Sequence, residues 1–424
     1  MKSDYVYKMA LRNIGRNKRR TILSFSAIAV AVIFVCFAKS YITGVTENIK
    51  KNVFLFESAH IKILNKDFVK EEKLMPLDLN IWGYKESYKE VIDKIKDIEE
   101  IRYILPRTRF VAILPLEGKI KTIMGLAIDY KLEEKINPLK EKIVEGRLFK
   151  EFAPGEYGMV MGKALADDLK VKVGDKITLM AKTAEEGLGH MTFKIVGIVS
   201  YGIGEVDKNY FFIPLSVAAK FLKMENEVGE IDIFLNDSNN SISIAEKINK
   251  ILESQPDNPY KAYPWEHQKD GQYYKFITMA DKIYNVIYII LLVLASLVII
   301  NTTMMVIYER LKEIGTISSL GMRHFAIVCL FFYEALIISV IGSFVGTILG
   351  GILSYLFSRQ GINIAKLSGG GINLQVSNIV YPHFGIDLLI FSFLFGVIVT
   401  AICVFIPSLR AAKIEPVKAL RGEI

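Results

Sequence analysis

The chain has 424 residues, of which 51% are hydrophobic and 23% charged, and its mean hydropathy is +0.31. This composition argues against a fully water-soluble protein, against a bundle buried wholly in lipid and against a disordered chain. Only three cysteines and 30 glycines are present, which excludes a disulfide scaffold and a collagen-like chain. The sequence therefore predicts one part in lipid and another large part in water.

The positive charge is concentrated beside apolar runs. Residues 1–20, 309–323 and 409–424 together hold 14 basic and 5 acidic residues, a net charge of +9, so the rest of the +8 chain sums to −1. Cytoplasmic segments next to membrane spans carry such an excess of Lys and Arg. A nucleic-acid-binding protein would carry the excess on its water-soluble part, so no nucleic-acid partner is expected.

Four apolar stretches are long enough, or nearly so, to cross a bilayer. The first has eighteen residues, which span about 27 Å as a helix, and it is longer than the core of a signal peptide. The charge pattern places both termini and the 309–323 loop in the cytoplasm. The predicted spans are Thr21–Ala38, Ile283–Tyr308, Ala326–Phe357 and Leu388–Ile406.

The predicted fold class is an α-helical membrane protein with four transmembrane helices and a large extracytoplasmic mixed α/β domain inserted between the first and second spans. Residues 1–43 hold an N-terminal interfacial helix and the first span, 44–280 the external domain, and 281–424 the other spans, a short cytoplasmic helix and the tail. Strand–helix–strand patterns occur at both ends of the external domain, with Pro106 as an interruption, and a β-rich insertion is expected near 120–205.

No motif in this chain supports catalysis or metal binding. Gly158–Ala164 approaches a phosphate-binding loop, but its glycines are one residue too close, and Ala164 lacks the hydroxyl that binds Mg²⁺. The five histidines are scattered, and the three cysteines lie inside apolar runs. We therefore expect no enzyme activity, no metal and no cofactor in this chain itself.

Tyr308–His324, between the second and third spans, is the most informative segment. Apolar residues recur about every third position, and Gly321 is suited to end a short helix. Such a helix either lies on the membrane surface or docks in a groove of a partner, and periodicity leaves both open. Further along, Gly342, Gly346 and Gly350 predict close helix packing against an unspecified neighbour, and Glu334 is expected to have a structural role.

Several segments resemble the FtsX-like permease family of the MacB/LolC/LolE type, and the resemblance covers essentially the whole chain. The approach to the second span, Tyr263–Phe276, is similar to the lipoprotein-releasing LolC/LolE branch. The segments that carry the family resemblance are Ala10–Asn13, Arg19–Thr21, Glu309–Gly315, Ser319–Met322, Tyr333–Leu336, Gly342–Gly346 and Pro407–Arg421.

The resemblance implies a permease subunit of an ABC transporter in the bacterial inner (cytoplasmic) membrane. Two permease chains, identical or different, would pair and bind a cytoplasmic ABC ATPase dimer, which would supply the ATP and Mg²⁺ sites. The coupling residues would be Glu309, Arg310, Lys312, Glu313, Ile314, Leu320, Gly321, Met322, Arg323 and His324. The candidate lining of a cargo cavity between spans one and two is Phe25, Ile28, Val32, Phe34, Phe37, Ile290, Val293 and Leu297.

Three functions follow from the resemblance. The first is extraction of acylated lipoproteins from the outer leaflet of the inner membrane, with membrane lipid and a periplasmic lipoprotein carrier as further partners. The second is MacB-like efflux by mechanotransmission, and the third is FtsX-like activation of a cell-wall hydrolase. The segment Ala181–Thr192 is shorter than the carrier-binding loop of the lipoprotein-releasing branch and has no proline, which argues against carrier recruitment by this chain.

Overall fold

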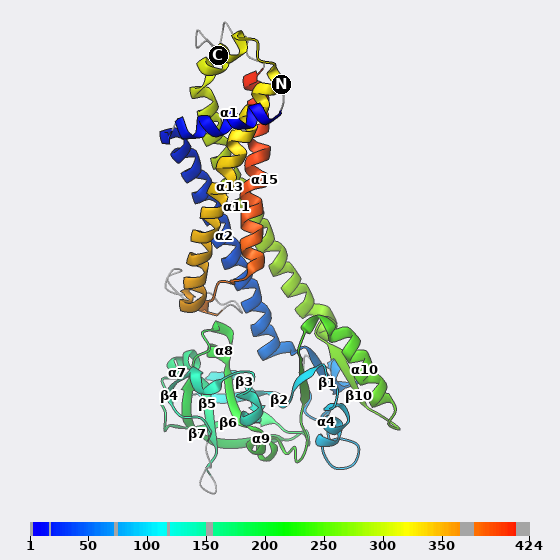
Figure 1. The fold of residues 1–424 in the computed structure, drawn as a ribbon. Helices are drawn as coiled ribbons and strands as arrows, with labels where there is room; N and C mark the ends of the chain where they lie inside the picture. The colour runs from blue at the N-terminus through cyan, green and yellow to red at the C-terminus, as the bar shows by residue number, and fades with distance from the viewer. Residues whose placement is uncertain are drawn as a thin grey trace. The chain divides into compact units, whose positions relative to one another are not determined.

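A computed structural model describes residues 3–16, 18–71, 75–116, 119–149, 156–364 and 377–412 (Figure 1). Residues 365–376 and the end of the tail from residue 413 lie outside these ranges. The chain divides into two compact units. The first comprises Met1–Thr46, Asp281–Ile362 and Val380–Ile424, and the second Glu47–Ala280 and Asn363–Ile379.

Long helices make up the first unit. Among the described residues, four helices are apolar and long enough to cross a membrane: Thr21–Ser58, Gln268–Thr302, His324–Gln360 and Ile386–Phe405. The helices of this unit are α1 (Ser3–Arg16), α2 (Lys18–Val53), α11 (Gln272–Glu309), α12 (Leu311–Ser319), α13 (His324–Gln360) and α15 (Ile386–Ala412).

Helix α2 extends well beyond the apolar stretch that predicts it. No proline interrupts residues 39–53, and the charged side chains there favour helix as much as the apolar ones do. The polar continuation carries the chain from the first unit into the second. Helix α11 likewise begins at Gln272, before the predicted start of its apolar run.

Glycines bring α13 and α2 into close contact. A Cβ atom on Gly346 would lie 2.7 Å from the carbonyl oxygen of Ala29, and one on Gly350 would lie 2.9 Å from the Cβ of Cys36. The helix that packs against Gly342, Gly346 and Gly350 of α13 is therefore α2 of the same chain. Helix α1 lies across these helices (Figure 1) and buries Val6 and Ala10 against Leu330 of α13.

The second unit is a ten-stranded sheet with helices on it. The strands follow the order β10-β1-β9-β2-β3-β8-β5-β7-β4, and β6 pairs with both β2 and β7. The strands are β1 (Ile61–Asn65), β2 (Ile101–Leu116), β3 (Lys119–Ile128), β4 (Ile143–Gly146), β5 (Gly158–Gly162), β6 (Lys176–Lys182), β7 (Leu188–Val199), β8 (Tyr210–Pro214), β9 (Glu230–Leu235) and β10 (Tyr260–Pro264), and a separate pair is β11 (Ile362–Asn363) and β12 (Ile379–Val380).

The sheet forms two parts that share β2. Because β6 pairs with β2 as well as β7, strands β2, β3, β8, β5, β7 and β6 close into a barrel, whose core includes Phe110, Phe193 and Phe211. Strands β10, β1, β9 and the first half of β2 form an open sheet covered by α4 (Lys89–Ile95) and α10 (Ser241–Glu253). The two strand–helix–strand patterns correspond to the open sheet, and the β-rich insertion corresponds to most of the barrel.

Short helices connect the strands. They are α3 (Phe68–Glu71), α5 (Tyr130–Glu133), α6 (Leu139–Lys142), α7 (Lys163–Leu169), α8 (Gly204–Asn209), α9 (Leu215–Leu222), the π-helix Phe54–Ser58 and the 3-10 turns Ser238–Asn240 and Gln268–Gly271. The expected interruption at Pro106 is wrong, because β2 runs through it. At this point β2 pairs with β9 alone, since β3 begins to pair at Arg107, and a strand with one neighbour tolerates a missing N–H donor.

Candidate functional site

The predicted coupling segment is a short helix that lies between two sharp changes of direction. Arg310 separates α11 from α12 and has a non-helical ψ of 7°. Helix α12 ends at Ser319, and Gly321 has a φ of +87°, a left-handed conformation that glycine adopts without strain. The amide of Gly321 donates to the carbonyl of Ser318 at 3.0 Å, which closes the helix end as the sequence predicts.

Arg310 fixes the start of α12 through buried ion pairs. Its side chain is 3% exposed, its Nη1 lies 2.5 Å from the Oε2 of Glu334 on α13, and its Nε lies 2.9 Å from the Oε2 of Glu313 on α12. The guanidinium also lies 5.0 Å from the ring centre of Phe331. Arg310 therefore connects α12 to α13, and Glu334 has the structural role expected of it.

The turn from the end of α12 to the start of α13 presents apolar and basic side chains together. Leu320 is 83% exposed and Phe325 76% exposed. The backbones of all ten predicted coupling residues are described, but the side chains of Lys312 and Ile314 lie outside what the structure describes. Of the others, Arg310 is buried, Glu313 and Met322 are half-buried, and the exposed ones are Glu309, Leu320, Gly321, Arg323 and His324.

The predicted cavity residues separate into two groups. Ile28 and Val32 are buried within the first unit against Ile338, and half-buried Phe25 packs on the same cluster. The ring centre of Phe37, also half-buried, lies 5.6 Å from that of Phe357. The exposed candidates are Phe34, Ile290, Val293 and Leu297, with exposed fractions of 46%, 54%, 52% and 47%.

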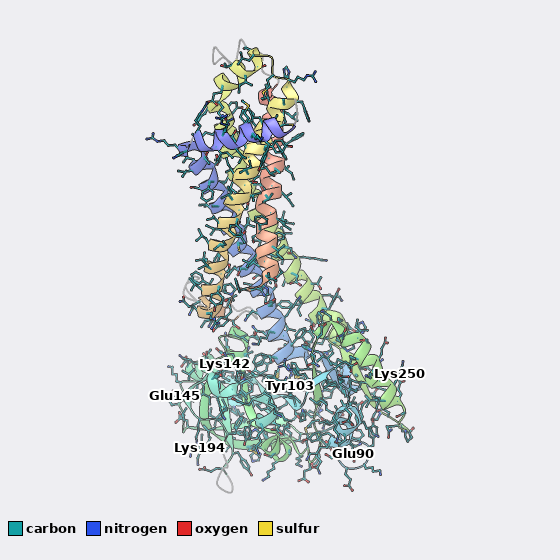
Figure 2. All side chains as sticks on the ribbon, in the orientation of Figure 1. Glu90, Tyr103, Lys142, Glu145, Lys194 and Lys250 are labelled. Carbon is teal, nitrogen blue, oxygen red and sulfur yellow. The ribbon has the colours of Figure 1, made fainter. Side chains whose placement is uncertain are left out.

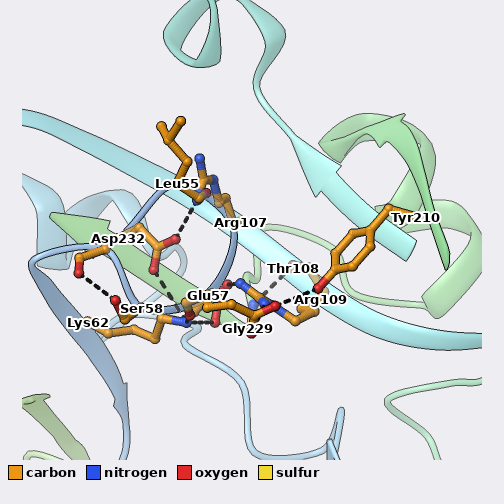
Figure 3. Close-up of polar contacts among 12 residues, drawn as sticks. Leu55, Glu57, Ser58, Lys62, Arg107, Thr108, Arg109, Tyr210, Gly229 and Asp232 are labelled. Carbon is orange, nitrogen blue, oxygen red and sulfur yellow. Dashed lines mark hydrogen bonds and ion pairs between the residues drawn. The ribbon is translucent and has the colours of Figure 1, made fainter. Parts of the chain in front are cut away.

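A buried network of charged side chains lies in the second unit, at the end of α2 (Figure 3). Arg107 of β2 is 1% exposed and makes two short contacts with the carboxylate of Glu133, at 2.7 and 2.9 Å, through its Nη2. Its Nη1 donates to the Oδ2 of Asp232 at 2.8 Å and to the carbonyl of Leu55 at 2.9 Å. A buried guanidinium thus has two carboxylate partners and holds the backbone of the helix end.

A second group of ion pairs continues the network. The Nζ of Lys62 lies 2.8 Å from the Oε2 of Glu230, and Arg109 lies 3.2 Å from both Glu230 and Glu57. Burial raises the pKa of Glu230, but Lys62 and Arg109 outweigh it and lower that pKa to about 2. Burial and the charge of Glu230 raise the pKa of neighbouring Asp232.

Glu57 of the π-helix is the member that joins most elements. Its Oε2 accepts hydrogen bonds from Arg109 of β2 at 3.2 Å and from the hydroxyl of Tyr273 of α11 at 3.0 Å. Its Oε1 accepts from the hydroxyl of Tyr210 of β8 at 3.0 Å. Burial and this carboxylate both raise the pKa of Tyr210, so the phenol stays protonated and able to donate.

These charges differ from the ordinary charged surface of the unit. Glu145 and Lys250, for example, are exposed at its periphery (Figure 2). Sequence reasoning missed the network because its members are far apart in the chain. One signal was present: Arg107 and Arg109, and likewise Glu230 and Asp232, stand two positions apart on strands and so share a face.

The described residues contain no group of three or more His, Cys, Asp or Glu side chains that is placed to hold a metal ion. The two charged regions are thus a short helix followed by an exposed apolar and basic turn, and a network that joins the end of α2 and the start of α11 to the sheet of the second unit.

Comparison with known proteins follows the same division of the chain. The model for the FtsX-like permease C-terminal family matches residues 285–416, and that for the MacB-like periplasmic core domain matches residues 21–251, which is more than half of the chain. These two matches include α12 and the charged network, respectively.

Relatives cover most of the chain at low identity. The chain is 24% identical to the lipoprotein-releasing system transmembrane protein LolC of Xylella fastidiosa, over 69% of this chain and 71% of that one. It is 23% identical to LolE of Haemophilus influenzae over 94% of both, and 25% identical to an uncharacterized ABC transporter permease of Methanocaldococcus jannaschii over 100% and 99%. The chain belongs to the FtsX-like permease family of ABC transporters, as a MacB/LolC/LolE-type permease subunit.

Proposed function

We propose that this permease extracts acylated lipoproteins from the outer leaflet of the cytoplasmic (inner) membrane, driven by a separate cytoplasmic ATPase. The observation that carries the proposal is the apolar face of α11. Ile290, Val293 and Leu297 recur at helical spacing and are each about half exposed, and the apolar stretch of this helix is the least buried among those of the four candidate spans. Acyl chains are the cargo that such a face suits.

The relatives support this choice of cargo, because those named LolC and LolE belong to lipoprotein-releasing systems. In the proposed assembly, a second permease chain, identical or different, supplies the opposite wall of the cavity. In the same proposal both termini and α12 lie in the cytoplasm and the second unit lies outside, and the excess of Lys and Arg beside the spans supports this orientation.

The proposed ATPase contact is the exposed turn from the end of α12 to the start of α13. Leu320 and Phe325 offer apolar side chains, and Arg323 and His324 stand between them, which suits a groove with an apolar floor and an acidic rim. The ATPase brings the ATP and Mg²⁺ sites. MacB-like mechanotransmission is the second candidate, and the match of residues 21–251 to the MacB-like core domain favours it.

Co-purification in nanodiscs tests the proposal. The chain is expressed with its neighbouring genes, and associated proteins and lipids are identified by mass spectrometry. An ATPase together with acylated lipoprotein supports extraction, an ATPase with a periplasmic adaptor and no lipoprotein supports efflux, and absence of any ATPase from an intact complex contradicts the proposed coupling.

A matched pair of variants tests the docking surface. Leu320→Asp places a charge in the proposed apolar contact and should reduce the recovered ATPase at least tenfold. Leu188→Asp, at a position of the second unit that is 62% exposed, should leave the recovery unchanged. Equal recovery with both variants would exclude Leu320 from the interface.

A further inference from the structure

The end of α2 is held firmly by the sheet of the second unit. The carbonyl of Leu55 accepts from Arg107, and the carbonyl of Glu57 accepts from the Nζ of Lys62 at 2.7 Å. Both cations are buried, so the loss of either carbonyl acceptor would leave an N–H donor of a buried cation unsatisfied. These hydrogen bonds hold the backbone of the π-helix at the end of α2, and they do not depend on the side chains of that segment.

Aromatic packing adds to this attachment. The ring centre of Phe54 lies 5.3 Å from that of Trp265, and the ring centre of Phe56 lies 4.8 Å from that of Tyr201. Both phenylalanines are buried. The π-helix Phe54–Ser58 is thus fixed on two sides, and α2 continues directly into it.

The start of α11 is built differently. Three consecutive residues before it, Lys269, Asp270 and Gly271, have φ values of 46°, 53° and 75°. This left-handed turn is unfavourable for residues other than glycine, and for lysine in particular. The buried side chain of Gln268 anchors the turn on its β10 side by donating to the carbonyl of Tyr263 at 3.0 Å. A strained turn directly before a helix is a place where the helix can change direction.

One carboxylate joins the two helix ends. Tyr273 lies in the first turn of α11, and its hydroxyl donates to Glu57, which belongs to the firmly held π-helix. The same carboxylate is oriented by Arg109 and Tyr210, which come from the sheet. The acceptor is therefore fixed in place, whereas the donor belongs to the helix that follows the strained turn.

We infer that Glu57 and Tyr273 form a latch, which holds the first turns of α11, up to Ala280, in one direction relative to the sheet, and that these turns rotate about residues 269–271 when the latch opens. The π-helix at the end of α2 and the sheet, both in the second unit, move as one body, and Glu57 and Tyr273 are positioning residues. The use of this motion during ATP-driven transport rests on the proposed function, whereas the latch itself requires neither an ATPase nor cargo.

Distances within the second unit test the latch in the full chain, without ATPase, in nanodiscs. After the three native cysteines are replaced, spin labels are placed on Met279 of α11 and Glu253 of α10, both exposed, and their distance distribution is measured by pulsed electron resonance. A second pair, on Lys51 of α2 and Glu253, reports on the held helix.

Three tyrosine variants are compared. Tyr273→Phe should at least double the width of the Met279–Glu253 distribution and leave the Lys51–Glu253 distribution unchanged. Tyr274→Phe removes a hydroxyl from the adjacent position of α11 and should change neither. Tyr210→Phe removes one of the two groups that orient the Glu57 carboxylate, while Arg109 remains, and should broaden the Met279–Glu253 distribution less than Tyr273→Phe does.

Two results would overturn the inference: an unchanged Met279–Glu253 distribution in Tyr273→Phe, or equal broadening of both pairs. Both tryptophans lie in the second unit, so a red-shifted emission reveals any variant that fails to fold. In that case Glu57→Gln, which weakens the acceptor and retains its backbone contacts, is measured with the same expectation. A failed co-purification would disprove the transport proposal and leave these distances unaffected.

Discussion

Removing the guanidinium of Arg107 should destabilise the second unit more than any change of a surface charge. Arg107→Leu leaves the buried carboxylates of Glu133 and Asp232 without their nearest cation, and it leaves the carbonyl of Leu55 without this donor. Breaking a buried ion pair by removing one partner costs about 3–5 kcal/mol. For a domain of this size, ~2–4 °C is lost per kcal/mol, which gives a decrease in Tm of roughly 6–20 °C.

Tryptophan fluorescence measures this decrease selectively, because Trp82 and Trp265 are the only tryptophans and both lie in the second unit. The matched control is Arg102→Leu on the same strand, where the side chain is exposed and lies 5.3 Å from the ring centre of Tyr103. Loss of an exposed cation–π contact costs about 0.5–1 kcal/mol. If the two variants lowered Tm equally, the reasoning about the buried network would be refuted.

Two further changes address helix packing and pH. Gly346→Ala would place a Cβ 2.7 Å from the carbonyl oxygen of Ala29, so it should lower the unfolding temperature in detergent by the equivalent of about 1–3 kcal/mol, whereas Gly15→Ala meets nothing within 4 Å and should be neutral. Burial lowers the pKa of His60 from 6.5 to about 4. The unfolded chain therefore binds the proton first, and stability should fall as pH drops from 6.5 to 4, by up to ~3 kcal/mol. His60→Gln should reduce this dependence of stability on pH, measured in fluorescence-monitored melts. An unchanged dependence would assign the effect to other groups.

The local features could be predicted from the sequence because each depends on a short stretch of the chain. The apolar runs predict the four long helices, and Gly321 predicts where α12 ends. The strand–helix–strand patterns predict the open sheet. In each case the signal is the regular spacing of apolar residues, or a turn-forming residue, within a short stretch of the sequence.

The charged network could not be predicted from the sequence because it depends on which strands become neighbours in the sheet. The alternation in Glu230–Leu235 predicts a strand with Ile231 inward and Glu230 outward, yet all six residues of β9 are buried. The charged face is covered because the end of α2 and the side chains of β2 pack there. The opposite charges are brought together by strand pairing, which sets Arg107 opposite Glu230 across β2 and β9, and Lys62 opposite Asp232 across β1 and β9.

The strands at the two ends of the sheet-forming segment lie side by side. β1 and β10 pair in antiparallel register, with Ile61 opposite Pro264, although about 200 residues separate them. The chain therefore leaves this domain beside the point at which it enters. A domain whose two ends are adjacent can be replaced by another domain without changing the helices on either side of it. Relatives can in this way keep the membrane helices and α12 while the domain between them diverges, and chimaeras joined at these two strands are the natural way to transfer it between permeases.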